Sequence, residues 1–371
     1  MSIKLSFTSI EKYKTCSKMY QLHYIDKIRS TLINSPLIFG KALDEALNCL
    51  LLNSNNPIDK FDELFTNIEF NGENVYIPTD TRIQYSKNDF DLTLLNTDDF
   101  SLIKDKQNNG AFSEINLDII KDYGEFHSTC LELKKEGVLD KDEHELFNLL
   151  CWLSLRKKAH LMISTYEKDI LPKIGKIINV QKQIELPNDK GDSIIGVIDL
   201  IAELNGEVHI IDNKSASKMY KEDSVVLSPQ LMLYGEHEEI NKGAFIVLDK
   251  IIKKTVEKTC KLCGHFTTKK VKLCDFDADG ERCNGELEEE IKHSVNWKII
   301  KDNFLEEKKE EMFNDIENVL DGIKKEDYNE NWNSCQTSNG TPKLMFGKKC
   351  IYHDYCRNGS MKNLIKKKEN V

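Results

Sequence analysis

The chain has 371 residues, of which 40% are hydrophobic and 31% are charged, and this composition excludes a collagenous or wholly disordered protein. The length exceeds what one core usually supports, so we expect a main domain with a helical extension or a small insert. The formal net charge of -10 argues against a uniformly basic surface that coats nucleic acid, although it leaves room for a local basic groove.

The N-terminus shows no sign of a targeting or membrane segment. Residues 1–7 carry one lysine and no apolar stretch of signal-peptide length. No segment approaches the roughly 20 apolar residues of a transmembrane helix. We therefore expect no membrane contact and, by default, a cytoplasmic location.

The first half of the chain is predicted to be mainly helical. A Ser/Thr-rich start, followed by apolar and aromatic residues at helical spacing, predicts an amphipathic helix over 6–25. The same period predicts helices over 42–52, 117–135 and 143–170. The segment 71–109 is polar and lacks a clear period, so we expect a loop or irregular structure there.

The pattern changes after Pro172, where short segments rich in β-branched residues alternate with turn signals. The dipeptide Asn205-Gly206 between two of these segments predicts a tight hairpin. Helices are expected over 229–239 and 302–323. The predicted strands are 177–186, 193–202, 207–212, 243–248 and 288–297.

Two carboxylates and a lysine are predicted to meet on the strands of this hairpin. Because alternate side chains of a strand share a face, Asp199 is expected on the apolar face of Ile195, Val197 and Ile201. On the next strand Asp212 and Lys214 share one side with Val208 and Ile210, and Ile211 and Asn213 point the other way.

Burying charges in this way is costly unless a partner or a metal compensates. Carboxylate oxygens suit Mg²⁺ or Mn²⁺, and Lys214 could orient or deprotonate an attacking water, which indicates phosphodiester hydrolysis. The alternative is a structural Asp-Lys pair at a strand end. The tripeptide Asp212-Asn213-Lys214 alone is weak evidence for a catalytic site, because Glu132-Leu133-Lys134 has the same form on a predicted helix surface.

Three segments together resemble the core of the RecB-like PD-(D/E)XK nucleases in order and spacing: Gly196-Val-Ile-Asp199-Leu, Ile210-Ile-Asp212-Asn-Lys214-Ser and Gln230-Leu-Met-Leu-Tyr234. The resemblance implies an α/β fold, a restriction-endonuclease-like mixed sheet flanked by helices. It also implies a metal-dependent deoxyribonuclease.

The resemblance also implies roles for individual residues. Asp199 and Asp212 would be metal ligands, the main-chain carbonyl of Asn213 would face the same metal, and Lys214 would be the catalytic lysine. Gln230 and Tyr234, on one helical face, would orient this lysine and contact DNA. The alternative for this last pair is a helix that simply packs on the sheet.

An earlier segment, Phe39-Gly40-Lys-Ala-Leu-Asp44-Glu45, resembles the family helix in which a histidine four residues after the glycine supplies a metal ligand. Asp44 stands at that position here. An aspartate can bind Mg²⁺ or Mn²⁺ through oxygen, so Asp44 is a candidate ligand. Glu45 is the neighbouring candidate, and either residue could instead be a solvated helix position.

The eleven cysteines fall into distinct groups. Cys49, Cys130 and Cys151 lie in apolar helical patterns and are predicted core residues. The pair Cys260-Lys-Leu-Cys263 is a zinc knuckle, and a second, longer-spaced pair completes a tetrahedral thiolate site. This pair is Cys274 and Cys283. The segment is a predicted zinc ribbon inserted between strands, which either contacts DNA or staples a polar loop.

The C-terminal segment Cys350-Ile-Tyr-His-Asp-Tyr-Cys356 resembles the end of the iron-sulfur motif in the AddB-like and CRISPR-associated branches of the family. The resemblance implies a [4Fe-4S] cluster held by Cys16, Cys335, Cys350 and Cys356. Gly347 stands where the family often has a further cysteine, and Cys335 lies fifteen residues before Cys350. A zinc site or free thiols are the alternatives.

These features predict an N-terminal cluster segment (1–30), a helical region (31–175), a nuclease core (176–255), a zinc-ribbon insert (256–287) and a closing segment (288–371). We expect an exonuclease that acts on DNA ends or single strands in replication, recombination or repair, and the composition suits an AT-rich genome such as that of a phage. The alternatives are a non-catalytic DNA-binding accessory protein and the nuclease subunit of a helicase-nuclease complex. The sequence contains no Walker-type phosphate loop, so a helicase would be a partner.

Overall fold

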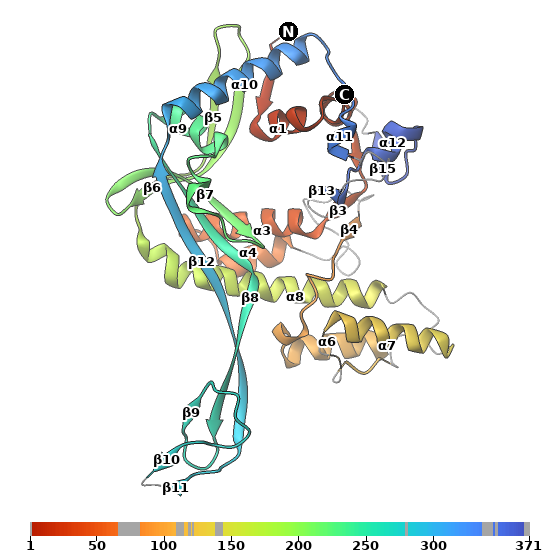
Figure 1. Ribbon diagram of the computed structural model, residues 1–371, viewed down its shortest axis with the longest axis vertical. Coiled ribbons are helices and arrows are strands. Elements are labelled where there is room, and N and C mark those ends of the chain that lie inside the picture. The colour runs from red at the N-terminus through yellow and green to blue at the C-terminus, as the bar shows by residue number, and fades with distance from the viewer. Residues whose placement is uncertain are drawn as a thin grey trace.

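The computed structural model of the protein describes residues 2–65, 82–108, 115–117, 120, 122–137, 144–278, 281–335, 344–345 and 348–366. It shows a central mixed sheet with helices on both faces, and a long two-stranded arm that projects from the body (Figure 1). The α/β architecture expected from the sequence is therefore present. No helix of the described part of the chain is long and apolar enough to cross a membrane.

The sheet is built around β6. Along its whole length β6 pairs antiparallel with β5, and its other edge is shared by β1, which is parallel, and β7, which is antiparallel. Beyond β7 follow β8, parallel to β7, and β12, antiparallel to β8. The strands are β1 (Lys4–Ser6), β5 (Ile174–Pro187), β6 (Ser193–Leu204), β7 (Glu207–Ala216), β8 (Lys242–Cys260), β9 (Phe266–Thr267, at the edge of β8) and β12 (Leu287–Asn303).

The turn between β6 and β7 confirms the predicted hairpin. Asn205 and Gly206 have φ values of 55° and 80°, and Leu204 pairs with Glu207 on either side of them. Positive φ at both central residues defines the type I′ turn, whose twist matches that of the strands. The turn therefore fixes the register between the two strands that carry the predicted catalytic residues.

Two hydrophobic cores lie on opposite faces of the sheet. The first packs α3 and α8 against Leu200, Ile211 and Ile246, and the second packs α1, α9 and α10 against Ile198, Ile210 and other residues. The predicted core residues Cys49, Cys130 and Cys151 are buried, as expected. The helices of these layers are α1 (Phe7–Thr15), α3 (Ser35–Leu51), α4 (Pro57–Leu64), α8 (His144–Thr165), α9 (Pro229–Glu238) and α10 (Glu306–Lys324).

The predicted first helix is interrupted at Cys16. The helix α1 begins after Ser6, whose side chain accepts a hydrogen bond from the backbone N–H of Ser9, as the Ser/Thr-rich start suggested. Cys16 adopts an extended conformation, with φ -166° and ψ 109°, and the chain then continues as α2 (Ser17–Tyr20) and a π-helical turn (Gln21–Ile25). Cys16 thus occupies a kink rather than a helix face.

The predicted loop over 71–109 is wrong in part. Residues 66–81 lie outside the described residues, but β4 (Arg82–Gln84) pairs with β3 (Leu32–Asn34), and α6 (Thr97–Asn108) is a helix. Two aspartates, Asp98 and Asp99, lie in the first turn of α6, where acidic side chains are favourable. A further helix, α7 (Tyr123–Lys135), matches the end of the predicted helix over 117–135.

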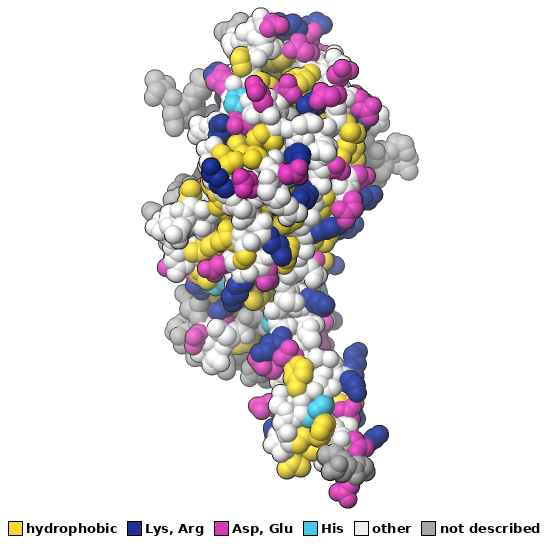
Figure 2. Space-filling model, turned by 90° about the vertical axis from the view of Figure 1, so that its left-hand side faces the viewer, with side chains coloured by type: hydrophobic (Ala, Val, Ile, Leu, Met, Phe, Trp, Pro, Cys, Tyr) yellow, Lys and Arg dark blue, Asp and Glu magenta, His cyan; other side chains and the backbone are white. Residues whose placement is uncertain are grey.

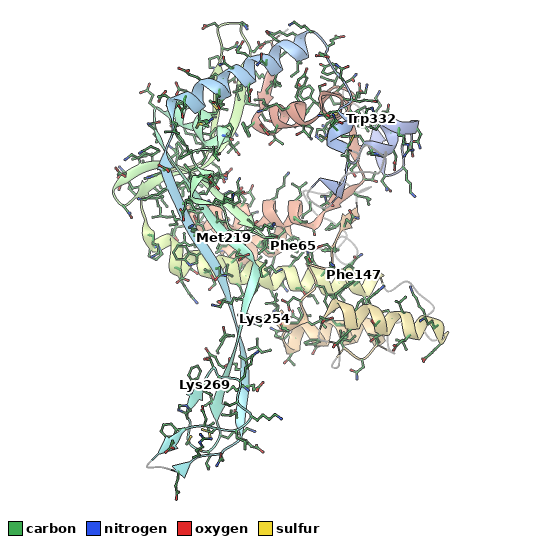
Figure 3. The ribbon with its side chains drawn as sticks, in the orientation of Figure 1. Phe65, Phe147, Met219, Lys254, Lys269 and Trp332 are labelled. Carbon is green, nitrogen blue, oxygen red and sulfur yellow. The ribbon has the colours of Figure 1, made fainter. Side chains whose placement is uncertain are left out.

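The arm is formed by the outer halves of β8 and β12, which pair as far as Cys260 and Leu287. Strand β8 is much longer than the predicted strand over 243–248. The prediction ended early because most side chains of the outer part of β8 are exposed or half-buried, and they show no alternation of apolar and polar residues. At its base Lys254 forms an ion pair with Asp91, and Lys269 lies on its tip (Figure 3). The tip also contains the short strands β10 (Asp277–Ala278) and β11 (Glu281–Arg282).

The two ends of the chain meet on one side of the body. Strand β2 (Ile28–Ser30) pairs with β15 (Leu364–Lys366), and a small core joins Leu22 and Ile28 to Tyr352. The short helices α11 (Trp332–Cys335) and α12 (His353–Asn358) lie in this region, with β13 (Leu344–Met345) and β14 (Lys348–Lys349) near them (Figure 1). The N-terminal kink at Cys16 and the C-terminal cysteines are therefore close in space.

Candidate active site

Strands β6 and β7 form a fork at the residues predicted to be catalytic. They pair from the turn as far as Leu200 and Ile211, and Asp199 and Asp212 are the next residue on each strand. Beyond the fork β7 continues along β8, and the edge of β6 is taken up by β1 at residues 193–195. The fork therefore opens a gap in the sheet at the two aspartates.

Hydrogen bonds hold the fork together. The backbone N–H of Asn213 donates to Asp199 Oδ2 at 3.1 Å, which links the two strands where their ladder ends. Lys214 Nζ lies 2.5 Å from Asp212 Oδ2, and Asp212 is only 3% exposed. The structure thus brings together the three residues that the sequence analysis singled out.

The side-chain alternation of β6 changes phase at the fork. Ile198 and Ile201 both belong to the core beside α9, whereas Leu200 belongs to the core beside α3. The prediction that Asp199 shares a face with Ile201 is therefore wrong. The neighbouring strand β5 is irregular at the same level of the sheet: Gln181 has a φ of 52°, a left-handed conformation inside a strand.

A cleft of about 390 Å³ lies between the fork and α3, and it is lined by Asp199, Asn213 and Lys214 from the sheet and by Gly40 and Asp44 from the helix. Asp44 therefore faces the predicted catalytic residues from the opposite wall. Its neighbour Glu45 is exposed and does not line the cleft. Of the two acidic candidates on this helix, the geometry favours Asp44.

The carboxylates of the cleft are crowded. Burial, together with the nearby carboxylates of Asp212 and Asp44, raises the pKa of Asp199 to about 9. Burial and the charges of Glu45 and Asp212 raise the pKa of Asp44 to about 6. Burial lowers the pKa of Lys214, but the Asp212 carboxylate outweighs it and the net shift is upward. Burial and mutual repulsion therefore disfavour the charged forms of these carboxylates when no cation lies between them.

Gln230 and Tyr234 lie on α9, on the other face of the sheet. Gln230 Nε2 donates a hydrogen bond of 3.1 Å to the Tyr234 hydroxyl, and the Tyr234 ring packs directly against Gly196 of β6. Burial raises the pKa of Tyr234. Tyr234 is 5% exposed and does not line the cleft, so the pair packs against β6 on the sheet face opposite the cleft.

Three residues that the sequence analysis did not single out also hold this site. Gln181 Nε2 donates to Asp44 Oδ2 and to Asn48 Oδ1, both at 3.3 Å. The Tyr166 hydroxyl donates to Asn213 Oδ1 at 3.0 Å, which fixes the Asn213 side chain. None of these residues stands in a motif, and only the tertiary structure brings them to the cleft.

The comparison with known families agrees with this geometry. Residues 132–357 match the family model of the PD-(D/E)XK nuclease superfamily. The chain belongs to the PD-(D/E)XK nuclease superfamily. No curated protein matches the chain.

Membership of the PD-(D/E)XK superfamily gives the cleft its chemical class. These proteins are nucleases that hydrolyse phosphodiester bonds with divalent metal ions, so the substrate is a nucleic acid. The residues present fit such an ion, because Asp199, Asp212 and Asp44 offer hard oxygen ligands and crowd one another without it. The region matched includes the fork, the cysteines of the arm and the C-terminal cysteines up to Cys356, but it includes neither Cys16 nor α3.

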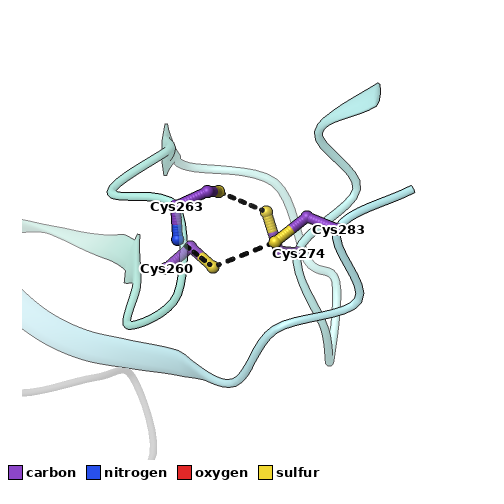
Figure 4. Close-up of side chains that lie close together, drawn as sticks. All are labelled: Cys260, Cys263, Cys274 and Cys283. Carbon is purple, nitrogen blue, oxygen red and sulfur yellow. Dashed lines mark hydrogen bonds between the residues drawn. The ribbon is translucent and has the colours of Figure 1, made fainter. Parts of the chain in front are cut away.

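The tip of the arm carries a second group that could hold a metal. Among the described residues, one set of three or more possible metal ligands has all its donor atoms within 4.8 Å of one another: Cys260, Cys263, Cys274 and Cys283 (Figure 4). The Sγ atoms of Cys260 and Cys283, and those of Cys263 and Cys274, are 3.6 Å apart. Backbone N–H groups of Cys263 and Leu262 point at Cys260 Sγ and lower its pKa to about 6. Burial, in contrast, raises the pKa of Cys274 to about 12, so these backbone contacts favour a thiolate at Cys260 in particular.

The third group lies where the chain ends meet. Cys16, Cys335, Cys350 and Cys356, the four residues expected to share a cluster, line one small cavity together with Trp332 and His353. Burial, followed by Glu330 and the other thiols, raises the pKa of Cys356 to about 12. The structure therefore brings these four cysteines together from the two ends of the chain.

Proposed function

We propose that the protein is a deoxyribonuclease that hydrolyses DNA at the fork between β6 and β7. The observation that carries this proposal is that Asp199, Asp44 and Lys214 line one cleft of a PD-(D/E)XK domain, with the Asp212 carboxylate held against Lys214 and close to Asp199. An accessory DNA-binding protein would not need three acidic side chains crowded beside a cleft that must receive a polyanion.

In this proposal each residue of the fork has a defined part. Asp199 and Asp212 hold Mg²⁺ or Mn²⁺ with the main-chain carbonyl of Asn213, and Asp44 adds an oxygen ligand where relatives use a histidine. A bound divalent ion supplies a Lewis acid and an acidified water. Lys214 is held 2.5 Å from Asp212, so its ammonium group is fixed at the edge of the cleft, where it can orient the attacking water. Asn213 fixes Asp199 through its N–H.

We further propose that cleavage is exonucleolytic, on single strands or DNA ends during replication, recombination or repair. Support comes from the resemblance to RecB-like enzymes. Labelling linear single-stranded and double-stranded DNA at either end tests polarity and substrate together, and a closed circular single strand serves as the comparison. Rapid cleavage of the circle would show an endonuclease instead.

Substitution of the fork tests the catalytic assignment. Asp199→Ala, Asp212→Ala and Lys214→Ala should each remove most Mn²⁺-dependent cleavage, whereas DNA binding should persist, because each change removes a metal ligand or the water-orienting group. The matched control is the double variant Glu132→Ala, Lys134→Ala, since the same tripeptide pattern on α7 lies far from the fork in sequence. Undiminished cleavage by Asp212→Ala would contradict the assignment.

We also propose that the four cysteines of the arm tip bind one zinc ion, with the arm as a zinc ribbon. Sulfur ligands in tetrahedral number favour Zn²⁺, and thiolates hold it far more tightly than carboxylates hold Mg²⁺. Elemental analysis should therefore find zinc after mild chelation that removes the catalytic metal. Zinc that stays unchanged after replacement of Cys260 and Cys263 would refute this.

The cysteines of the terminal cavity are proposed to hold an iron-sulfur cluster. Cys16, Cys350 and Cys356 supply three thiolates, and the resemblance gives Cys335 as the fourth. Protein purified without oxygen should be brown and carry about four irons per chain. Cys16→Ala and Cys356→Ala should lose the colour. Because the cluster would tie the two chain ends together, both variants should also unfold at lower temperature.

A further inference from the structure

The terminal cavity contains a buried histidine that the cysteine assignment leaves without a role. His353 is 1% exposed and lines the cavity with the four cysteines. Its Nε2 atom is buried and has no hydrogen-bond partner within the part of the chain that the structure describes. A buried polar atom without a partner destabilises the fold, so such an atom beside a cavity points to something that fills the cavity.

The other nitrogen of the ring explains which kind of group is missing. His353 Nδ1 lies 3.2 Å from Asp354 Oδ1, and a carboxylate can only accept, so Nδ1 carries the proton. A neutral ring that donates through Nδ1 keeps a lone pair on Nε2. Histidines that bind metals almost always give their other N–H to a carboxylate or carbonyl in this way. Trp332 meets the ring edge-on, with centroids 6.1 Å apart, and helps to fix its plane.

Cys335 is less suited to the fourth ligand position. Its Sγ donates back to the carbonyl oxygen of Asn331, at 3.3 Å, one turn earlier in the chain. The thiol therefore already has a hydrogen-bond partner as a neutral group, whereas the lone pair of His353 has none.

We propose that His353, through Nε2, and not Cys335, is the fourth ligand of the metal centre held by Cys16, Cys350 and Cys356. This inference rests on the proposed cluster and changes one of its ligands. The centre would thus have three thiolates and one imidazole. Replacement of thiolate by imidazole removes negative charge from the cluster, as in centres where histidine ligands raise the reduction potential.

Pulsed electron paramagnetic resonance on oxygen-free, dithionite-reduced protein labelled with ¹⁵N-histidine tests this directly. A coordinated imidazole nitrogen should give a strong hyperfine coupling that Cys335→Ser keeps and that His353→Cys abolishes. His353→Cys should nevertheless retain its iron, because it supplies a thiolate in place of the imidazole. This rescue separates a lost ligand from a misfolded chain.

The matched control is His23→Gln, since His23 is a half-buried histidine of the same region whose Nδ1 meets the Tyr352 hydroxyl at 3.0 Å. It should leave the nitrogen coupling unchanged. If the wild type contains iron but shows no strong nitrogen coupling, and if Cys335→Ser loses the iron, the inference is wrong and the four-cysteine cluster stands. Protein made without oxygen that holds no iron would overturn both proposals.

Discussion

Adding one methyl group at Gly196 would test whether the fork is as tightly supported as the structure shows. A Cβ at Gly196 would lie 2.6 Å from Cε1 and 2.9 Å from the hydroxyl oxygen of Tyr234. Non-bonded carbons pack at about 3.5–4.0 Å, so the ring or the strand must move by roughly 1 Å. Tyr234 is 5% exposed and cannot swing into solvent. We expect Gly196→Ala to lower the free energy of unfolding by about 1–3 kcal/mol.

The same displacement should reach the chemistry, because Gly196 lies three residues before Asp199. A misplacement of about 1 Å can reduce an enzymatic rate by about 100-fold, and we expect a loss of this order for Mn²⁺-dependent DNA cleavage. Urea unfolding gives the stability, and initial rates on end-labelled DNA give the activity. In a Tyr234→Leu background the methyl group has room, so Gly196→Ala should cost much less there.

Gly40→Ala is the control for the stability measurement. Among the described residues, no atom outside the backbone of helix α3 and the chain neighbours of Gly40 lies within 4 Å of a Cβ at Gly40, so alanine should stabilise the protein by up to about 1 kcal/mol. The two glycine substitutions should therefore change the free energy of unfolding in opposite directions. If Gly196→Ala unfolds and cleaves like the wild type, Tyr234 does not support β6 rigidly and the reasoning fails.

Two further predictions concern the metals. Mn²⁺ at 100 times its dissociation constant should stabilise the wild type by about 2.7 kcal/mol in calorimetry. Asp199→Asn should lose this gain, and without metal it should be no less stable than the wild type, because it relieves the crowding of carboxylates. If Mn²⁺ stabilises Asp199→Asn as much as the wild type, Asp199 is not a metal ligand. Gly285→Ala would place a Cβ 2.7 Å from Cys260 Sγ and so disturb the thiolate site. Elemental analysis should find less zinc in this variant, whereas its cleavage of short DNA substrates should persist. A full zinc content would show that the tip accommodates the methyl group.

The fork could be predicted from the sequence because local rules fix it. The Asn205-Gly206 turn sets the register, and strand alternation then places Asp212 and Lys214 on one side. The phase change beside Asp199 could not be predicted in this way. It coincides with the left-handed conformation of Gln181 on the neighbouring strand, and a non-local backbone irregularity leaves no periodic signal in β6.

Burial explains the other differences. The outer part of β8 is solvated on both faces, so residues such as Ile251, which is 62% exposed, carry no pattern that distinguishes strand from loop. His353 shows the opposite case. A histidine between two cysteines carries no sign of its burial in the sequence, and only the meeting of the chain ends encloses it.

A final prediction concerns the ion pair that joins α4 to α8. Asp62 accepts from Arg156 Nε at 2.8 Å and meets His160 Nε2 at 2.8 Å. Burial alone would raise the pKa of Asp62, but the bonds from Arg156 and His160 outweigh it and lower the pKa from 3.8 to about 2. At about 1.4 kcal/mol per unit, the charged carboxylate contributes about 2 kcal/mol to folding.

The sign follows from the direction of this shift. A carboxyl whose pKa is lower in the folded chain stabilises it fully above the unfolded value of 3.8, and the gain is lost as the pH falls toward 2. Asp62→Asn should therefore cost about 2 kcal/mol at pH 6 and about half as much at pH 3, when unfolding is measured in urea. Asp59→Asn on the same helix, where the carboxylate lies in the first turn, is the matched control. A cost for Asp62→Asn that is equal at both pH values would mean that packing or the neutral hydrogen bond, and not the charge of Asp62, holds α4 against α8.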